Sequence, residues 1–128
     1  MNIPASDHLH LREEEDGVTI PFERNRNDKG SLFAGSIYAG AILAAYRAAE
    51  RLCAASGLSG DLVAKTAAIT YLKRIDSDGR AVAVPQGEPH RKPNGNHAVK
   101  IAVTVSDAAG AACAEVTAEL ILMAKRPT

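Results

Sequence analysis

The sequence from residue 30 to residue 46 reads Gly30-Ser-Leu-Phe-Ala-Gly-Ser-Ile-Tyr-Ala-Gly-Ala-Ile-Leu-Ala-Ala-Tyr46 and contains no charged residue. A membrane-spanning helix needs about 20 apolar residues, and this stretch is shorter and includes Gly35 and Gly40, so we exclude a membrane anchor. The helix formers that follow, closed by Gly57, predict one long helix ending near Ser56. Because its first turns are apolar on almost every face, other elements must enclose it.

The residues before this helix predict one strand and one polar loop. Apolar residues alternate along Val18-Thr-Ile-Pro-Phe22, where the proline suggests an edge or a strand end. The segment 23–29, Glu-Arg-Asn-Arg-Asn-Asp-Lys, is rich in residues that favour turns. The acidic run 13–16 is expected to face solvent.

The residues after the helix predict four strands. The clearest is 99–106, where Val99, Ile101, Val103 and Val105 alternate with polar residues. Turn residues at 76–79 and 107–110, and a polar loop at 86–96, separate the segments. The other expected strands span 62–75, 80–84 and 116–122.

This order predicts an α+β fold in which an antiparallel sheet of about five strands wraps a long central helix. The length of 128 residues predicts a single domain over 1–128. Two architectures fit, the hotdog fold and a cystatin-like sheet gripping a helix. The strand before the helix favours the hotdog fold, whereas the cystatin-like alternative would leave only a small-ligand pocket or an interaction module.

The amino-acid composition excludes several classes of binding partner. Lys and Arg number 15, as do Asp and Glu, so no excess charge is available for nucleic acid or an anionic membrane. Cys53 and Cys113 are too few for a disulfide framework or a zinc cluster, and we expect no metal and no cofactor. The N-terminal residues lack the pattern of a signal peptide, so a cytoplasmic protein is expected. The chain has 24 alanines and only 4% aromatic residues, and the small core that this composition allows suggests a homodimer or a dimer of dimers.

The loop and helix start resemble a known family. The loop-to-helix turn of hotdog thioesterases is matched here by Asn27, Gly30, Ser31 and Gly35. The sequence of residues 30–38 looks still more like the thioesterase domain of the YiiD C-terminal type. Ala-Ile-Thr-Tyr at 68–71 resembles a strand of the same domain. The resemblance implies an enzyme acting on acyl thioesters of coenzyme A or acyl carrier protein.

The resemblance also implies a site at the helix start. The unpaired N–H groups and partial positive charge of a helix N-terminus can stabilise an oxygen that becomes negative during reaction. Each matching residue also has a structural alternative: turn formation for Asn27, close packing for Gly35 and helix capping for Ser31. The expected catalytic residues are Asn27, Gly35, Ser36 and Tyr71. The expected substrate-binding residues at this place are Gly30, Ser31, Phe33, Ala34 and Tyr38.

One departure from the family pattern leaves the chemistry open. Many hotdog thioesterases carry an acid about two turns into the helix, but residues 39–44 here read Ala-Gly-Ala-Ile-Leu-Ala. The hydroxyls of Ser36, Tyr38 and Tyr46 are not bases near neutral pH. Decarboxylation of a malonyl thioester needs hydrogen-bond donors rather than a base, and Tyr71 is the candidate donor. Hydrolysis, decarboxylation and non-catalytic binding of acyl thioesters therefore all remain possible.

Basic residues suggest where the carrier binds. Coenzyme A and acyl carrier protein both present phosphate at the end of a pantetheine arm, which Arg or Lys side chains can contact. The candidates are Lys73, Arg74, Arg91 and Lys92. A solvated hairpin tip explains the last two equally well.

Overall fold

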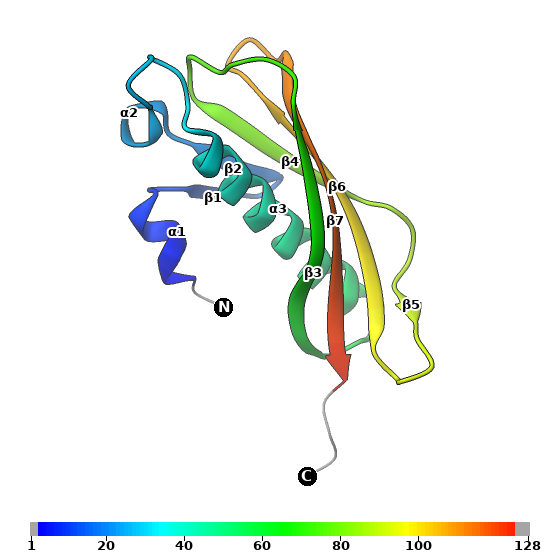
Figure 1. Cartoon of the computed structure of the whole chain (residues 1–128). Coiled ribbons are helices and arrows are strands. Elements are labelled where there is room, and N and C mark those ends of the chain that lie inside the picture. Colours follow the sequence, from blue (N-terminus) through cyan, green and yellow to red (C-terminus); the bar gives the residue numbers. More distant parts are fainter. Residues whose placement is uncertain (1–2, 125–128) are drawn as a thin grey trace.

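Helix α3 (Ala34–Ala55) packs against one face of an antiparallel sheet in the computed structural model, which describes residues 3–124 (Figure 1). The sheet has seven strands, in the order β1-β2-β4-β6-β7-β3, with β5 paired to β6. Two short helices, α1 and α2, precede α3. The remaining elements are α1 (Pro4–His8), β1 (Arg12–Glu14), β2 (Gly17–Ile20), α2 (Phe22–Asn25), β3 (Gly60–Tyr71), β4 (Gly79–Pro85), β5 (His90–Arg91), β6 (His97–Ser106) and β7 (Ala112–Ala124).

The predicted architecture is confirmed, but the expected number of about five strands is too low. The long helix and the strands predicted after it are all present. The two unexpected strands are short: β1 has three residues and β5 has two. Both are too short and too polar to show the alternation by which a strand is recognised. Their pairing to β2 and β6 provides the backbone partners that define them.

Helix α3 approaches the sheet closely because its buried face is built from small residues. Ala41, Ala44, Ala45 and Ala49 are all almost fully buried. A Cβ on Gly40 would lie 2.5 Å from Cγ1 of Ile20 on β2, so only glycine fits there. The helix ends at the predicted place, since Ser56 follows it and Gly57 has a φ of 73°.

The inward faces of β6 and β7 form the other half of the core. Val99, Ile101, Val103 and Val105 on β6 are at most 2% exposed. Two of their partners on β7, Leu120 and Val116, are each 1% exposed. The alternation predicted for these strands therefore reports the side that faces α3.

Two predicted boundaries before α3 are wrong. The strand expected to reach Phe22 ends at Ile20, and the segment expected as a polar loop begins with α2. Pro21 lies between them, and the Phe22 N–H donates to Asp78 Oδ1 at 2.8 Å. Helix α2 thus starts on an acceptor that is far away in the sequence.

Two further expectations also change at their edges. The strand expected over 62–75 stops at Tyr71, because the N–H groups of Leu72 and Lys73 both donate to the Cys113 carbonyl and the ladder ends. The acidic run is exposed as expected, but its first two residues belong to β1. One of them, Glu13, contacts Arg47 of α3 with an Nε–Oε1 distance of 2.5 Å.

Candidate active site

The segment before α3 is a tight turn organised by Asn27. Its Oδ1 accepts from the N–H groups of Lys29 at 2.8 Å and Ser31 at 3.2 Å, and its Nδ2 donates to Ser31 Oγ at 3.0 Å. Gly30 has a φ of 75°, the left-handed conformation that favours glycine. The Asn27 amide is therefore engaged within the turn, where it positions the chain that enters the helix.

Asn25 holds this turn against the rest of the molecule, and the sequence interpretation missed it. Its side chain is 3% exposed, and Nδ2 donates to the carbonyls of Leu9 at 2.7 Å and Pro21 at 3.0 Å. Its own carbonyl accepts from the Phe33 N–H at 2.8 Å. In the loop sequence Asn25 looks like another turn former, and no local signal distinguishes it from Asn27.

The first turn of α3 offers free backbone donors. No side chain caps this helix, and Phe33 precedes it in an extended conformation. The N–H groups of Ser36 and Ile37 both donate to the Phe33 carbonyl. The N–H groups of Ala34 and Gly35 come earlier in the chain and have no acceptor within the helix. The geometry is that of a small anion site or a polarising site for a carbonyl.

Gly35 is packed beneath the Phe33 ring. A Cβ on Gly35 would lie 2.6 Å from Phe33 Cε2, so any larger residue displaces the ring. Phe33 itself is 57% exposed and immediately precedes the helix. Ser36, in contrast, is buried in the first turn, so its hydroxyl does not face solvent beside the free backbone donors.

Tyr71 brings the end of β3 to the start of α3. Its hydroxyl donates to the Ala34 carbonyl at 2.9 Å. Burial, together with the nearby Tyr38, raises the pKa of Tyr71. The hydroxyl is therefore a hydrogen-bond donor rather than a base at neutral pH.

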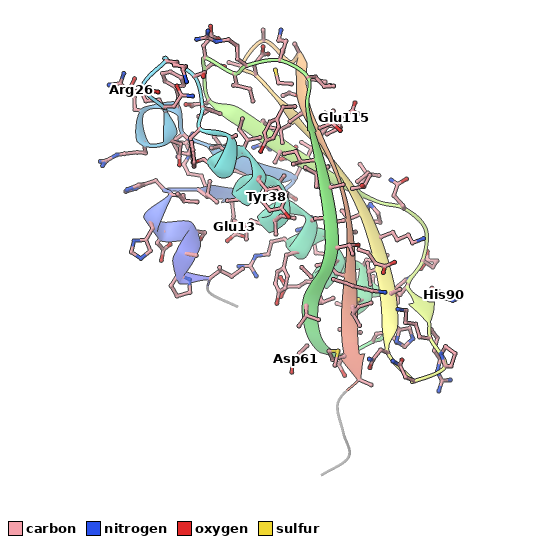
Figure 2. The ribbon with its side chains drawn as sticks, viewed as in Figure 1. Glu13, Arg26, Tyr38, Asp61, His90 and Glu115 are labelled. Carbon is pink, nitrogen blue, oxygen red and sulfur yellow. The ribbon has the colours of Figure 1, made fainter. Side chains whose placement is uncertain are left out.

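The predicted basic residues divide between the two ends of the sheet. Arg74 lies at the helix start, where its Nη2 donates to the Lys29 carbonyl at 3.0 Å. Lys73 precedes Arg74 in the chain, and its Nζ lies 3.6 Å from Oδ2 of Asp107. Arg91 pairs with His97, at the opposite end of β6, and Lys92 follows it. Figure 2 shows this separation through Arg26 near the helix start and His90 on β5.

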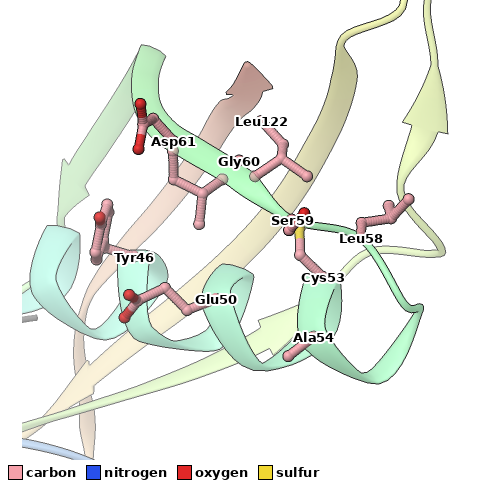
Figure 3. A pocket seen from close by; sticks show the side chains of 10 residues that line it. Tyr46, Glu50, Cys53, Ala54, Leu58, Ser59, Gly60, Asp61 and Leu122 are labelled. Carbon is pink, nitrogen blue, oxygen red and sulfur yellow. The ribbon is translucent and has the colours of Figure 1, made fainter. Parts of the chain in front are cut away.

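Two cavities of similar size lie along α3. A pocket of about 350 Å³ surrounds the end of the helix and the start of β3, with Tyr46, Glu50 and Asp61 in its wall (Figure 3). A groove of about 340 Å³ lies between the first half of α3 and the N-terminal segment. Tyr46 borders both cavities.

Neither a metal centre nor a membrane span is found in residues 3–124. No cluster of three or more His, Cys, Asp or Glu residues there could hold a metal ion. No helix in the same range has the length and apolar character to cross a bilayer. Cys53 and Cys113 are buried and unpaired, and burial raises the pKa of both thiols.

Comparison with known families gives one match that covers nearly the whole chain. The sequence model described as "Putative thioesterase (yiiD_Cterm)" matches residues 1–122. No match is found among curated proteins. The family match includes both the turn around Asn27 and the strand that carries Tyr71.

Solved structures share the fold. A "putative thioesterase" from Shewanella oneidensis is 25% identical, with a TM-score of 0.81 over 95% of this chain and 90% of that one. A thioesterase from Haemophilus influenzae is 19% identical, with a TM-score of 0.64 and coverages of 94% and 82%. The BH2602 protein from Bacillus halodurans, solved with CoA, is 16% identical, with a TM-score of 0.75 and coverages of 96% and 78%.

Proposed function

Because this chain belongs to the thioesterase family whose sequence model spans residues 1–122, we propose that it hydrolyses acyl thioesters of coenzyme A or acyl carrier protein. The observation that carries the proposal is the uncapped start of α3, where the N–H groups of Ala34 and Gly35 precede any intrahelical acceptor. A thioester needs such donors at its carbonyl oxygen, because the oxygen becomes negative when water attacks the carbon.

The surrounding residues support this chemistry by position. The thioester oxygen accepts from the N–H groups of Ala34 and Gly35, and the helix dipole stabilises the developing charge. The Asn27 turn holds these donors in place, and Tyr71 fixes the first turn through the Ala34 carbonyl. Phe33 shields one side of the reacting group from water.

Hydrolysis also needs a group that activates water, and the first half of α3 supplies none. The first carboxylate in the helix is Glu50, four turns after Gly35. Tyr71, whose hydroxyl contacts the helix start, is not a base at neutral pH, since its pKa is raised. We propose that the base comes from a second copy of the chain.

We propose a homodimer formed through β3, in which the two copies complete each other's sites. Strand β1 at one edge of the sheet is three residues long and fully charged, whereas β3 at the other edge has 12 residues, of which only Asp61 and Lys65 are charged. A long, weakly charged edge invites pairing with a second copy, and a two-fold axis makes that pairing antiparallel. A tetramer would form from two such dimers.

Antiparallel pairing sets the Gly60 end of one β3 beside the Tyr71 end of the other. The pocket with Glu50 and Asp61 then lies near the helix start of the second copy and supplies the general base. The same symmetry carries Arg91 and Lys92 toward that site, where they add to the positive charge of Arg74. CoA in the Bacillus halodurans neighbour supports coenzyme A as one carrier.

The proposal is tested by incubating the protein with a panel of acyl-CoA and acyl carrier protein thioesters, including malonyl-CoA. Thiol release and mass detection of the products are followed together. We expect free thiol and free acid from unbranched acyl substrates. Acetyl-CoA formed from malonyl-CoA without thiol release would instead identify a decarboxylase, and binding without either product would identify an acyl-thioester-binding protein. The buried, unpaired cysteines favour a reducing cytoplasm as the compartment.

A further inference from the structure

The groove along the first half of α3 is lined almost wholly by apolar side chains. It has a volume of about 340 Å³, and none of its lining residues within the described range 3–124 is charged. One wall is α3, and the other wall is the N-terminal segment that contains α1 (Figure 1). The lining residues are Ile3, Ala5, Ser6, Leu9, Leu11, Tyr38, Ala39, Ile42, Leu43 and Tyr46.

The α3 wall forms a straight stripe. Tyr38, Ile42 and Tyr46 are spaced by four residues, so they lie on one side of the helix, above one another. The rise of a helix separates the first and last of them by about 12 Å. Tyr38 is labelled on α3 in Figure 2.

The N-terminal wall is fixed by hydrogen bonds rather than by packing alone. Ser6 Oγ donates to the Ile3 carbonyl at 2.9 Å, and the Leu11 N–H donates to the Ser6 carbonyl at 3.1 Å. Buried Asn25 donates to the Leu9 carbonyl at 2.7 Å. The groove is therefore held open by the same residue that anchors the loop leading to the helix start.

One end of the groove is formed by Tyr38, close to the proposed reaction centre. Tyr38 lies one turn after Ala34 and close enough to Tyr71 to raise its pKa. Tyr71 in turn donates to the Ala34 carbonyl. A thioester held at the N–H groups of Ala34 and Gly35 thus has its acyl carbon next to the Tyr38 end.

We propose that this groove binds the hydrocarbon chain of a linear, medium-chain acyl thioester, an inference that rests on the proposed function. This largely apolar lining suits a hydrocarbon, and its described residues offer no positive charge to a carboxylate or a phosphate. An extended chain advances about 1.2 Å per single bond, as extended polypeptide does, so the stripe from Tyr38 to Tyr46 spans about ten carbons. The preferred substrate is therefore a decanoyl thioester or a close neighbour in length.

The test compares kcat/KM for thiol release from acetyl-, hexanoyl-, decanoyl- and hexadecanoyl-CoA. We expect the value to rise by about fourfold per added methylene until the groove is full, which is the gain for burying one such group. Ala39→Trp places an indole in the groove, and the ratio of decanoyl-CoA to acetyl-CoA should then fall by at least about thirtyfold. Ala55→Trp, at an exposed position at the end of α3 that lines neither cavity, is the matched control and should leave this ratio unchanged.

Several outcomes would overturn the proposal. A wild-type ratio near one, or a ratio that Ala39→Trp leaves unchanged, would show that the chain binds elsewhere. A change in oligomeric mass on Ala39→Trp without a change in the ratio would show that a second copy covers the groove. Ala39→Leu is the milder variant if the indole prevents folding, as judged from the thermal midpoint.

Binding separates failure of this inference from failure of the proposed function. If no substrate releases thiol, the dissociation constants of decanoyl-CoA and acetyl-CoA are compared by calorimetry. Tighter binding of decanoyl-CoA that Ala39→Trp abolishes would retain the groove while hydrolysis is rejected. Equal binding of the two would reject the groove as well.

Discussion

The two cavities along α3 have nearly the same volume, about 340 and 350 Å³, but opposite linings. Among the described residues, the groove beside the first half of the helix has no charged residue in its lining, whereas the pocket at the end of the helix contains Glu50 and Asp61. Size alone therefore does not indicate what each cavity holds. The difference in lining is the basis on which we propose hydrocarbon for the groove and activated water for the pocket.

The pocket also contains Cys53, which is not a competing nucleophile. The thiol is buried, and burial raises its pKa, so the reactive thiolate is scarce at neutral pH.

The two carboxylates of the pocket differ in their partners. Glu50 is held by Arg47, whose Nη1 lies 2.8 Å from Oε1 of Glu50. Asp61 on the exposed edge strand has no ion pair within the described residues. Replacing these two carboxylates is therefore the most direct test of the role proposed for the pocket.

The largest expected effect comes from replacing both carboxylates of the pocket. The double variant Glu50→Gln and Asp61→Asn should lower kcat by about 10²- to 10⁴-fold, the range for loss of a general base, while the decanoyl-to-acetyl ratio is kept. The measurement is steady-state thiol release. Retention of full activity would show that the base lies elsewhere.

Subunit exchange provides the control for this variant. If each site takes its donors from one copy and its base from the other, as we propose, mixing the double variant with Gly35→Val should restore about a quarter of the wild-type activity. Two inactive proteins that stay inactive after exchange, with mixed dimers verified by mass, would contradict a site shared between copies.

Gly35→Val should lower kcat/KM by about 10²- to 10³-fold, the cost of losing an oxyanion donor. The added side chain meets the Phe33 ring and blocks the approach of the thioester to the first turn. Thermal denaturation of the same variant is the comparison. Stability lost in proportion to activity would favour a glycine needed only for packing.

Asn27→Ala should lower activity and stability together. The side chain makes several hydrogen bonds within the turn, so the variant loosens the chain that leads into α3. We expect a loss of about 1–3 kcal/mol in the free energy of unfolding and a lower kcat. Activity lost at unchanged stability would assign the amide directly to the substrate.

Tyr71→Phe should have the smallest effect, a loss of a few-fold in kcat, because about 1 kcal/mol is the usual worth of one hydrogen bond. The raised pKa keeps the hydroxyl protonated, so the ratio of wild type to variant should be constant from about pH 6 to pH 9. Rates measured across this range are the test. A ratio that changes with pH would make Tyr71 a proton-transfer group.

The sequence predicted the elements whose periodicity is strong and missed those that depend on distant partners. The long helix follows from an uncharged, alanine-rich stretch, and strands β6 and β7 follow from alternating apolar and polar residues. Both patterns are local and do not depend on distant parts of the chain. The N-terminal wall of the groove could not be predicted, because residues 3–11 show no strong pattern and are held by Asn25 from elsewhere in the chain.

The candidate site divides in the same way. The turn and helix start were expected as a site because the sequence around Asn27, Gly30 and Gly35 resembles the loop-to-helix turn of hotdog thioesterases. The structure gives these residues local roles in backbone geometry and packing. The separation of Arg91 from Arg74 follows only from the strand register. A sequence shows that basic residues exist, but the pairing of strands decides which of them share an end of the sheet.

Hydrolysis at the start of α3 is tested most directly by product analysis in ¹⁸O-labelled water. Decanoyl-CoA is incubated with the wild-type protein and with Gly35→Val, and both CoA thiol and decanoate are quantified by mass. We predict equal amounts of thiol and of decanoate carrying one ¹⁸O for the wild type, and almost none for the variant. Unlabelled decanoate, no thiol, or equal turnover by the variant would contradict the account.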